Sequence, residues 1–181
     1  KNISEKVKLN LINDKSNSHL NISQNLIKKN KNKKIRLGYY SADFRNHATS
    51  YLIANLFEEH DREKFEIFAF SFGPNFEDKM KNRIKKSVDK FYDVSFKNDH
   101  EISSLSKDLK IDIAIDLMGF TEHNRFGIFL KRCAPIQVNY LGYAGTLGCK
   151  NIDYLIADQI LIPKESQKFY TEKIIYMPDT Y

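Results

Sequence analysis

The chain has few cysteines and lacks any long hydrophobic run. Its 181 residues include two cysteines, Cys133 and Cys149, and neither belongs to a Cys-x-x-Cys pair or a Cys/His cluster. No apolar stretch approaches the roughly 18 residues that a membrane-spanning helix needs. The charged amino terminus also lacks the apolar segment of a signal peptide. These absences argue against a disulfide framework and favour a reduced, cytoplasmic protein with no membrane partner.

Metal-binding spacings are missing as well. The sequence contains no Asp-x-Asp motif, and no group of His, Asp and Glu residues stands at the spacing of metal ligands. It contains no internal repeat. The missing spacings predict no metal site. Separately, we expect no bound cofactor.

Positive charge is concentrated at the amino terminus. Residues 1–34 contain nine lysines against Glu5 and Asp14, a net charge of +7, whereas the whole chain carries +6. Nucleic-acid binding calls for basic residues spread over a folded surface, so we expect no nucleic-acid partner. We interpret residues 1–34 as a basic Lys/Asn-rich linker, partly disordered, with a short helix near residues 4–11.

The rest of the chain alternates between strand-like and helix-like segments. Apolar runs predict strands at residues 35–40, 65–72, 91–94, 111–117, 136–141, 154–157 and 173–177. Helix-length segments at residues 50–60, 76–87 and 101–109 separate several of these runs. Such alternation predicts βαβ units and a mainly parallel sheet. Residues 35–181 are therefore expected to form one α/β domain, which is large enough to bury its own core.

The first predicted strand ends in a polar turn. Residues 35–50 read IRLGYYSADFRNHATS, so the apolar run gives way to Asp43, Arg45 and His47 just before a helix that Thr49 or Ser50 can cap. Ligands of parallel sheets gather at the carboxyl ends of strands. A histidine can accept a hydroxyl proton near neutral pH. This turn therefore predicts an active-site histidine, with a surface or capping role as the alternative.

Two later strand ends are also rich in polar residues and glycine, at residues 116–125 and 141–148. If the strands are parallel neighbours, all three ends open on the same edge of the sheet. The amides of the glycines could approach a phosphate, although their spacing matches neither the dinucleotide nor the P-loop fingerprint. A tight structural turn is the alternative. The three glycines are Gly142, Gly145 and Gly148.

Other polar residues have simpler interpretations. Thr121 could cap a helix, and Arg125 could clamp an anion or pair with Glu122. Three histidines are expected at the solvated surface, namely His19, His60 and His100.

Five sequence blocks together resemble one enzyme family. They are GYYSADFRNH at 38–47, DLMGFTEHNR at 116–125, APIQVNYLGYAGT at 134–146, IDYLIAD at 152–158 and YTEKIIYMP at 170–178. In order and spacing they resemble the catalytic region of the O-linked N-acetylglucosamine transferases, glycosyltransferase family 41, in their bacterial form. The resemblance covers residues 34–181.

The resemblance implies a fold, an activity and partners. The family has a GT-B fold of two Rossmann-like halves, and residues 35–181 resemble the N-terminal half, a three-layer sandwich around a mainly parallel sheet. The family transfers N-acetylglucosamine from UDP-GlcNAc to Ser/Thr of proteins, with inversion and without a metal. Its other parts, a C-terminal half with most UDP contacts and upstream TPR repeats, have no counterpart here. We therefore expect an acceptor-side half that is inactive as this fragment.

The resemblance also implies site residues. His47 matches an active-site histidine that serves as general base or orients the acceptor hydroxyl. Thr121, Tyr143, Gly145 and Thr146 match residues that bind substrates. Two departures accompany these matches: Ala144 replaces a proline and Phe120 replaces a polar aromatic residue.

Two alternatives remain open. The chain could be a non-catalytic module that binds the acceptor protein. It could also belong to a transferase of the same fold with another donor, such as a protein fucosyltransferase or glucosyltransferase.

Overall fold

A seven-stranded, wholly parallel sheet forms the centre of the molecule in the computed structural model, which describes residues 34–179 and 181. The predicted linker and its helix near residues 4–11 lie outside the described residues, as does His19. The strands are β1 (Ile35–Ser41), β2 (Phe65–Ser71), β3 (Lys90–Asp93), β4 (Ile113–Asp116), β5 (Ile136–Tyr140), β6 (Tyr154–Ala157) and β7 (Lys173–Tyr176). The helices are α3 (Ala48–Glu59), α4 (Lys79–Ser87), α5 (Asp99–Asp108) and α6 (Gly127–Leu130), with a 3₁₀ helix, η1 (Lys164–Phe169).

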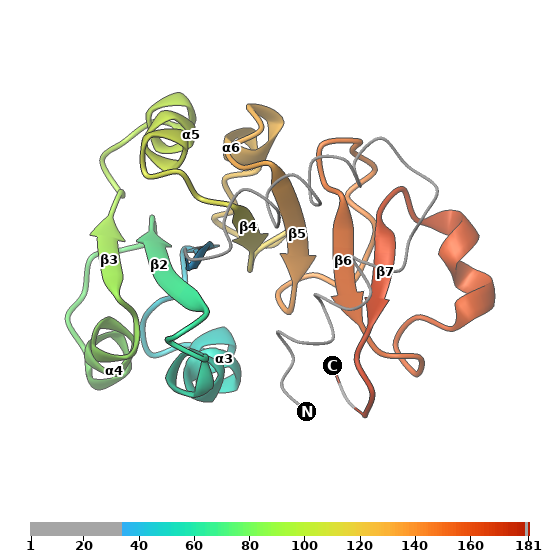
Figure 1. Ribbon diagram of the computed structural model, residues 1–181, viewed down its shortest axis with the longest axis horizontal. Helices are drawn as coiled ribbons and strands as arrows, with labels where there is room; N and C mark the ends of the chain where they lie inside the picture. Colours follow the sequence, from blue (N-terminus) through green and yellow to red (C-terminus); the bar gives the residue numbers. More distant parts are fainter. Residues whose placement is uncertain (1–33, 180) are drawn as a thin grey trace.

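The strand order reverses next to β1. Across the sheet the order is β3-β2-β1-β4-β5-β6-β7, from one end of the molecule to the other in Figure 1. The chain thus builds outward on one side of β1 and then returns to place β4 on the other side. Open α/β sheets bind ligands at such a reversal, beyond the carboxyl ends of the strands. The reversal therefore marks the edge between β1 and β4 as the place to look for a site.

Helices cover both faces of the sheet. Figure 1 shows α3 and α4 on one side and α5 and α6 on the other. Alternate residues of β1 follow this division, because Tyr39 packs in the cluster with α3 while Tyr40 packs in the cluster with α5 and α6. The Tyr40 ring stacks on Phe70, with centroids 4.5 Å apart. The predicted three-layer α/β sandwich with a parallel sheet is confirmed.

Side-chain caps determine where three helices begin. Asp78 caps α4, and Asn98 forms a capping box with Glu101 at α5. The N-cap of α3 is His47, whose Nδ1 accepts a hydrogen bond from the amide of Thr49. The expectation that Thr49 or Ser50 caps this helix is therefore wrong by two or three residues.

The segment around Thr121 does not begin a helix. The hydroxyl of Thr121 donates 2.9 Å back to the carbonyl of Met118, which closes a turn instead of capping a helix. His123 follows with φ of 63°, a left-handed conformation that ends any helical run. Helix α6 starts only after Phe126 and has no side-chain cap.

His60 is buried, so its expected place at the solvated surface is wrong. Its Nε2 and the hydroxyl of Tyr39 lie 2.8 Å apart and share a hydrogen bond. Burial, assisted by the nearby guanidinium of Arg62, lowers the pKa of His60 to about 4. His100 is exposed, as expected.

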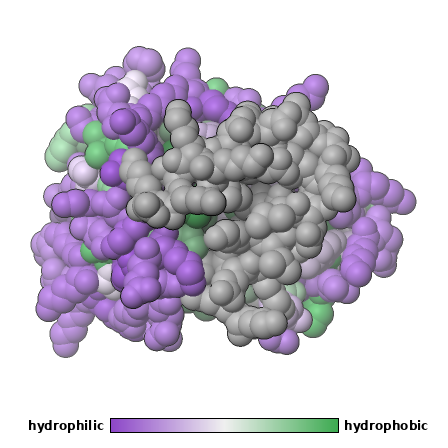
Figure 2. All heavy atoms as spheres, viewed as in Figure 1, coloured by the Kyte–Doolittle hydropathy of each residue, from purple (hydrophilic) through white to green (hydrophobic). Residues whose placement is uncertain are grey.

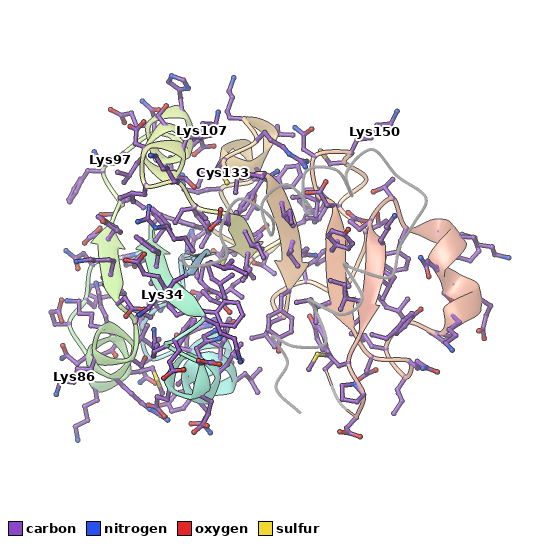
Figure 3. The ribbon with its side chains drawn as sticks, viewed as in Figure 1. Lys34, Lys86, Lys97, Lys107, Cys133 and Lys150 are labelled. Carbon is purple, nitrogen blue, oxygen red and sulfur yellow. The ribbon has the colours of Figure 1, made fainter. Side chains whose placement is uncertain are left out.

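The described surface is mainly hydrophilic in the view of Figure 2, with small hydrophobic patches. Figure 3 shows Lys86, Lys97, Lys107 and Lys150 extending outward from separate parts of the molecule. Cys133, by contrast, is buried, and burial raises the pKa of its thiol to about 12. Among the described residues, helices are all too short or too polar to cross a bilayer.

The buried His60 makes stability depend on pH. The folded state keeps the ring neutral down to about pH 4, whereas the unfolded chain binds a proton near pH 6.5. Stability from this residue is therefore complete above pH 6.5 and is lost as pH falls toward 4. Between pH 7 and pH 5 the loss should reach about 2 kcal/mol.

The measurement is urea unfolding at pH 7 and pH 5 for the wild-type chain, His60→Gln and the exposed control His100→Gln. When the pH is lowered from 7 to 5, the free energy of unfolding of the wild type and of the control should fall by about 2 kcal/mol more than that of His60→Gln. Equal losses in all three chains would show that His60 titrates normally.

Candidate active site

Three loops meet at the carboxyl edge of the sheet beside the reversal point. They follow β1, β4 and β5 and comprise residues 42–47, 117–126 and 141–153; we call them the β1, β4 and β5 loops. The sulfur of Met118 accepts hydrogen bonds from the hydroxyl of Ser41 at 3.3 Å and from the amide of Ala42 at 3.4 Å. This contact joins the β4 loop to the β1 loop.

Glycine allows the β5 loop to lie directly against the β4 loop. A Cβ on Gly142 would lie 2.0 Å from the carbonyl oxygen of Leu117, and a Cβ on Gly119 would lie 2.5 Å from the Cβ of Tyr143. Only residues without side chains fit at these two positions. The expected convergence of the three strand ends is thus present in the structure.

The β1 loop is built around Asp43, which is largely buried. Its backbone amide donates to the Ser41 hydroxyl, and its carbonyl accepts from the Ser50 hydroxyl. Its Oδ1 accepts from Nη2 of Arg45 at 3.1 Å. Because both ends of the residue are held, its carboxylate stays close to His47.

His47 occupies the last position of this loop. Its Nδ1 lies 3.3 Å from the amide nitrogen of Thr49 and 3.5 Å from Oδ2 of Asp43. Its side chain is 38% exposed. Within the described part of the chain, Nε2 has no hydrogen-bond partner, so this nitrogen is available to a ligand.

The turn of the β4 loop is held by Asp116. Its two carboxylate oxygens accept hydrogen bonds from the amides of Met118 and Gly119, at 2.9 and 3.2 Å. Burial raises the pKa of Asp116 to about 7, against the opposing effect of these two amides. A carboxyl group with this pKa exchanges its proton near neutral pH, at the edge where the three loops meet.

Beyond this turn, Phe120 forms an exposed aromatic surface. The residue is 48% exposed, and its ring contacts the rings of Phe126 and Tyr143, with centroids 5.2 and 5.8 Å away. The Tyr143 ring also packs against Gly145, where a Cβ would lie 2.7 Å from it. Two of the predicted substrate-binding residues, Tyr143 and Gly145, therefore lie together beside this surface.

The hydroxyls of the two predicted threonines are used inside the protein. The hydroxyl of Thr121 donates to the Met118 carbonyl. The hydroxyl of Thr146 donates 2.7 Å to Oε2 of Glu172, and the amide of Leu147 donates to Oε1 of the same carboxylate. Their contribution is to hold the β4 and β5 loops in place. No described hydrogen bond joins either threonine to His47.

Two further expectations are settled by internal contacts. Arg125 pairs with Asp99, with Nε 2.7 Å from Oδ1, so the alternative pairing with Glu122 is wrong. The amides of Gly142 and Gly148 donate to the Tyr140 carbonyl and to the Thr146 hydroxyl. The amide of Gly145 makes no hydrogen bond within the described residues and is the one glycine amide of the three left for a ligand.

Asp116 and Glu172 are the site carboxylates that the sequence did not single out. Asp116 had a usable signal, since it is the polar last residue of a buried strand. Glu172 had none, because its partners Thr146 and Leu147 lie 26 and 25 residues earlier in the chain. Among residues 34–179 and 181, no three His, Cys, Asp or Glu side chains are grouped closely enough to hold a metal ion.

Comparison with known proteins gives consistent matches. The family model described as glycosyl transferase family 41 matches residues 4–181. The probable UDP-N-acetylglucosamine–peptide N-acetylglucosaminyltransferase SEC of Arabidopsis thaliana is 38% identical over 149 residues, which cover 82% of this chain and 15% of that protein. The UDP-N-acetylglucosamine–peptide N-acetylglucosaminyltransferase of Caenorhabditis elegans is 35% identical over 150 residues, which cover 82% of this chain and 13% of that protein.

A solved structure matches the same region. A mutant O-GlcNAc transferase of Thermobaculum terrenum superposes with a TM-score of 0.79 at 33% identity. The match covers 83% of this chain and 29% of the solved one. The chain thus spans less than a third of the length of each of these relatives.

Substitution of two glycines that have left-handed backbone can distinguish the energetic cost of backbone strain from the cost of disturbed loop packing. Gly119 has φ of 56° and touches Tyr143, whereas Gly148 has φ of 62° and no atom near its missing Cβ. Gly148→Ala should therefore cost about 1 kcal/mol from the backbone alone. Gly119→Ala should cost roughly 3 kcal/mol or more, because the new methyl group displaces Tyr143. Urea unfolding of both variants measures the difference, and equal costs would contradict the contact between the β4 and β5 loops.

Proposed function

The chain belongs to glycosyltransferase family 41, and we propose that it forms the acceptor-side half of a protein O-GlcNAc transferase. The complete enzyme would transfer N-acetylglucosamine from UDP-GlcNAc to the hydroxyl of a serine or threonine in an acceptor protein. Its fold would be GT-B, with these residues as the first Rossmann-like half. A second half and upstream TPR repeats would complete it.

One observation carries the proposal. The β4 loop contacts both the β1 loop and the β5 loop beside the reversal of strand order, and these loops carry three of the family's five sequence blocks. The reversal of an open α/β sheet is where such folds bind substrates. Chemistry-bearing groups at that edge include His47 and the amide of Gly145.

The reaction itself is a displacement at the anomeric carbon of the sugar. The acceptor oxygen forms a bond to this carbon from the face opposite the nucleotide, the bond to the diphosphate oxygen breaks, and UDP leaves with the bonding electrons. The hydroxyl proton passes to a base or to water. In this proposal His47 contacts the acceptor hydroxyl, either to take its proton or to orient it.

The leaving diphosphate needs hydrogen-bond donors, since negative charge develops on its oxygen. The amide of Gly145 is one donor that this half offers. We expect most of the remaining donors, including a lysine, to come from the second half. The transfer would proceed with inversion and without a metal ion. The choice of sugar would also rest on the second half, so a fucosyl or glucosyl donor is distinguished by assay of the complete enzyme.

His47 can be tested without disturbing helix α3. Asparagine is among the best N-cap residues and alanine among the poor ones. In the complete enzyme, His47→Asn should have the same stability as the wild type, and its kcat/KM should be about 100-fold lower. His47→Ala should lose the same activity and about 1 kcal/mol of stability as well.

The matched control is His123→Asn, an exposed histidine on the β4 loop at a left-handed backbone position that asparagine tolerates. It should retain activity within about twofold, an ordinary surface effect. Wild-type turnover of His47→Asn would remove His47 from the mechanism.

The proposal that the second half makes most of the donor contacts gives a second test. Calorimetry of the 181-residue chain with UDP-GlcNAc, and with UDP as the control ligand, should show no micromolar binding. The reason is that most donor contacts are assigned to the other half. Micromolar binding of UDP-GlcNAc would contradict this assignment and favour a self-contained binding module.

A further inference from the structure

Two groups compete for one nitrogen of His47. The amide of Thr49 and the carboxylate of Asp43 both approach Nδ1, at 3.3 and 3.5 Å. An amide N–H can only donate a hydrogen bond, and a carboxylate can only accept one. The two partners therefore require opposite states of Nδ1. Whichever partner Nδ1 satisfies decides which nitrogen of the neutral ring carries the proton.

The geometry favours the amide of Thr49. This amide is one of the first N–H groups of helix α3, which have no partner inside the helix and depend on the N-cap side chain. Its contact with Nδ1 is a hydrogen bond by both distance and angle. Nδ1 must then keep its lone pair, so the proton of the neutral ring stands on Nε2.

Arg45 weakens the competing partner. Its guanidinium donates to Oδ1 of Asp43 at 3.1 Å and offsets the negative charge of the carboxylate. The hydroxyls of Ser41 and Ser50 hold the backbone of Asp43 on both sides. The carboxylate is thus held beside Nδ1, but it already accepts a hydrogen bond from Arg45. Removing Arg45 would leave Asp43 with His47 as its remaining side-chain partner among the described residues.

We infer that neutral His47 is a hydrogen-bond donor through Nε2, and that Arg45, acting through Asp43, is the positioning residue that keeps it so. The Nε2–H has no hydrogen-bond partner within the described chain. Its ligand would be an oxygen atom, and under the proposed function this is the oxygen of the acceptor hydroxyl. That hydroxyl would be oriented by His47 and would give its proton to a different group.

The tautomer can be observed directly in the 181-residue chain. Long-range ¹H–¹⁵N correlation spectra of the ¹⁵N-labelled chain would be recorded near pH 8.5, where histidine side chains are ordinarily neutral. His47→Asn identifies the His47 signals by their absence. We expect an unprotonated, pyridine-like shift for Nδ1 and a protonated, pyrrole-like shift for Nε2. The reverse pattern would overturn the inference.

Variants then test the part of Arg45. Arg45→Ala should raise the population of the ring protonated on Nδ1, because Asp43 loses its other partner. Arg45→Ala combined with Asp43→Ala should restore the wild-type pattern. The matched control is Arg125→Ala, which removes a guanidinium from the β4 loop, where it pairs with Asp99. It should leave the pattern unchanged.

An unchanged spectrum in Arg45→Ala would overturn the positioning role. These spectra need neither substrate nor turnover. A chain that fails the transfer assay can still show the inferred tautomer, and a working transferase can still show the opposite one. Failure of this inference and failure of the proposed function are therefore distinguishable.

Discussion

Because β1 and β4 pair in parallel, with Tyr40 opposite Asp116, the loops that follow them leave the sheet side by side. Everything else at the site depends on this pairing. It brings Met118 against Ser41 and Ala42, so the turn held by Asp116 lies against the beginning of the β1 loop. The pairing of β4 with β5 then adds the third loop on the other side.

Buried carboxylates, rather than regular structure, hold the three loops in shape. In the β1 loop, Asp43 accepts a hydrogen bond from Arg45. In the β4 loop, Asp116 accepts hydrogen bonds from the amides of Met118 and Gly119. Glu172 accepts hydrogen bonds from the Thr146 hydroxyl and the Leu147 amide of the β5 loop. The polar groups of the loops therefore fall into two sets. The hydroxyls of Thr121 and Thr146 are bonded inside the protein, whereas Nε2 of His47 and the amide of Gly145 have no hydrogen-bond partner among the described residues.

Much of the fold could be predicted from the sequence, because buried parallel strands are continuous apolar runs and their ends are marked by polar residues. The strand at residues 154–157 was predicted to the residue. The failures concern single side chains. His60 lies inside, where the hydroxyl of Tyr39 on β1 is its partner, and Arg125 pairs with Asp99 at the start of α5. Such contacts join residues about 20 or more positions apart, and local pattern does not contain them.

Under the proposed function, the carboxyl edge between β1 and β4 would be the acceptor side of the transfer site. The most direct test is a crystal structure of the parent enzyme with an acceptor peptide and a non-transferable UDP-GlcNAc analogue. The account predicts the acceptor hydroxyl oxygen within hydrogen-bond distance of Nε2 of His47, with the peptide beside Phe120. An acceptor hydroxyl bound elsewhere, with His47 contacting neither substrate, would contradict it.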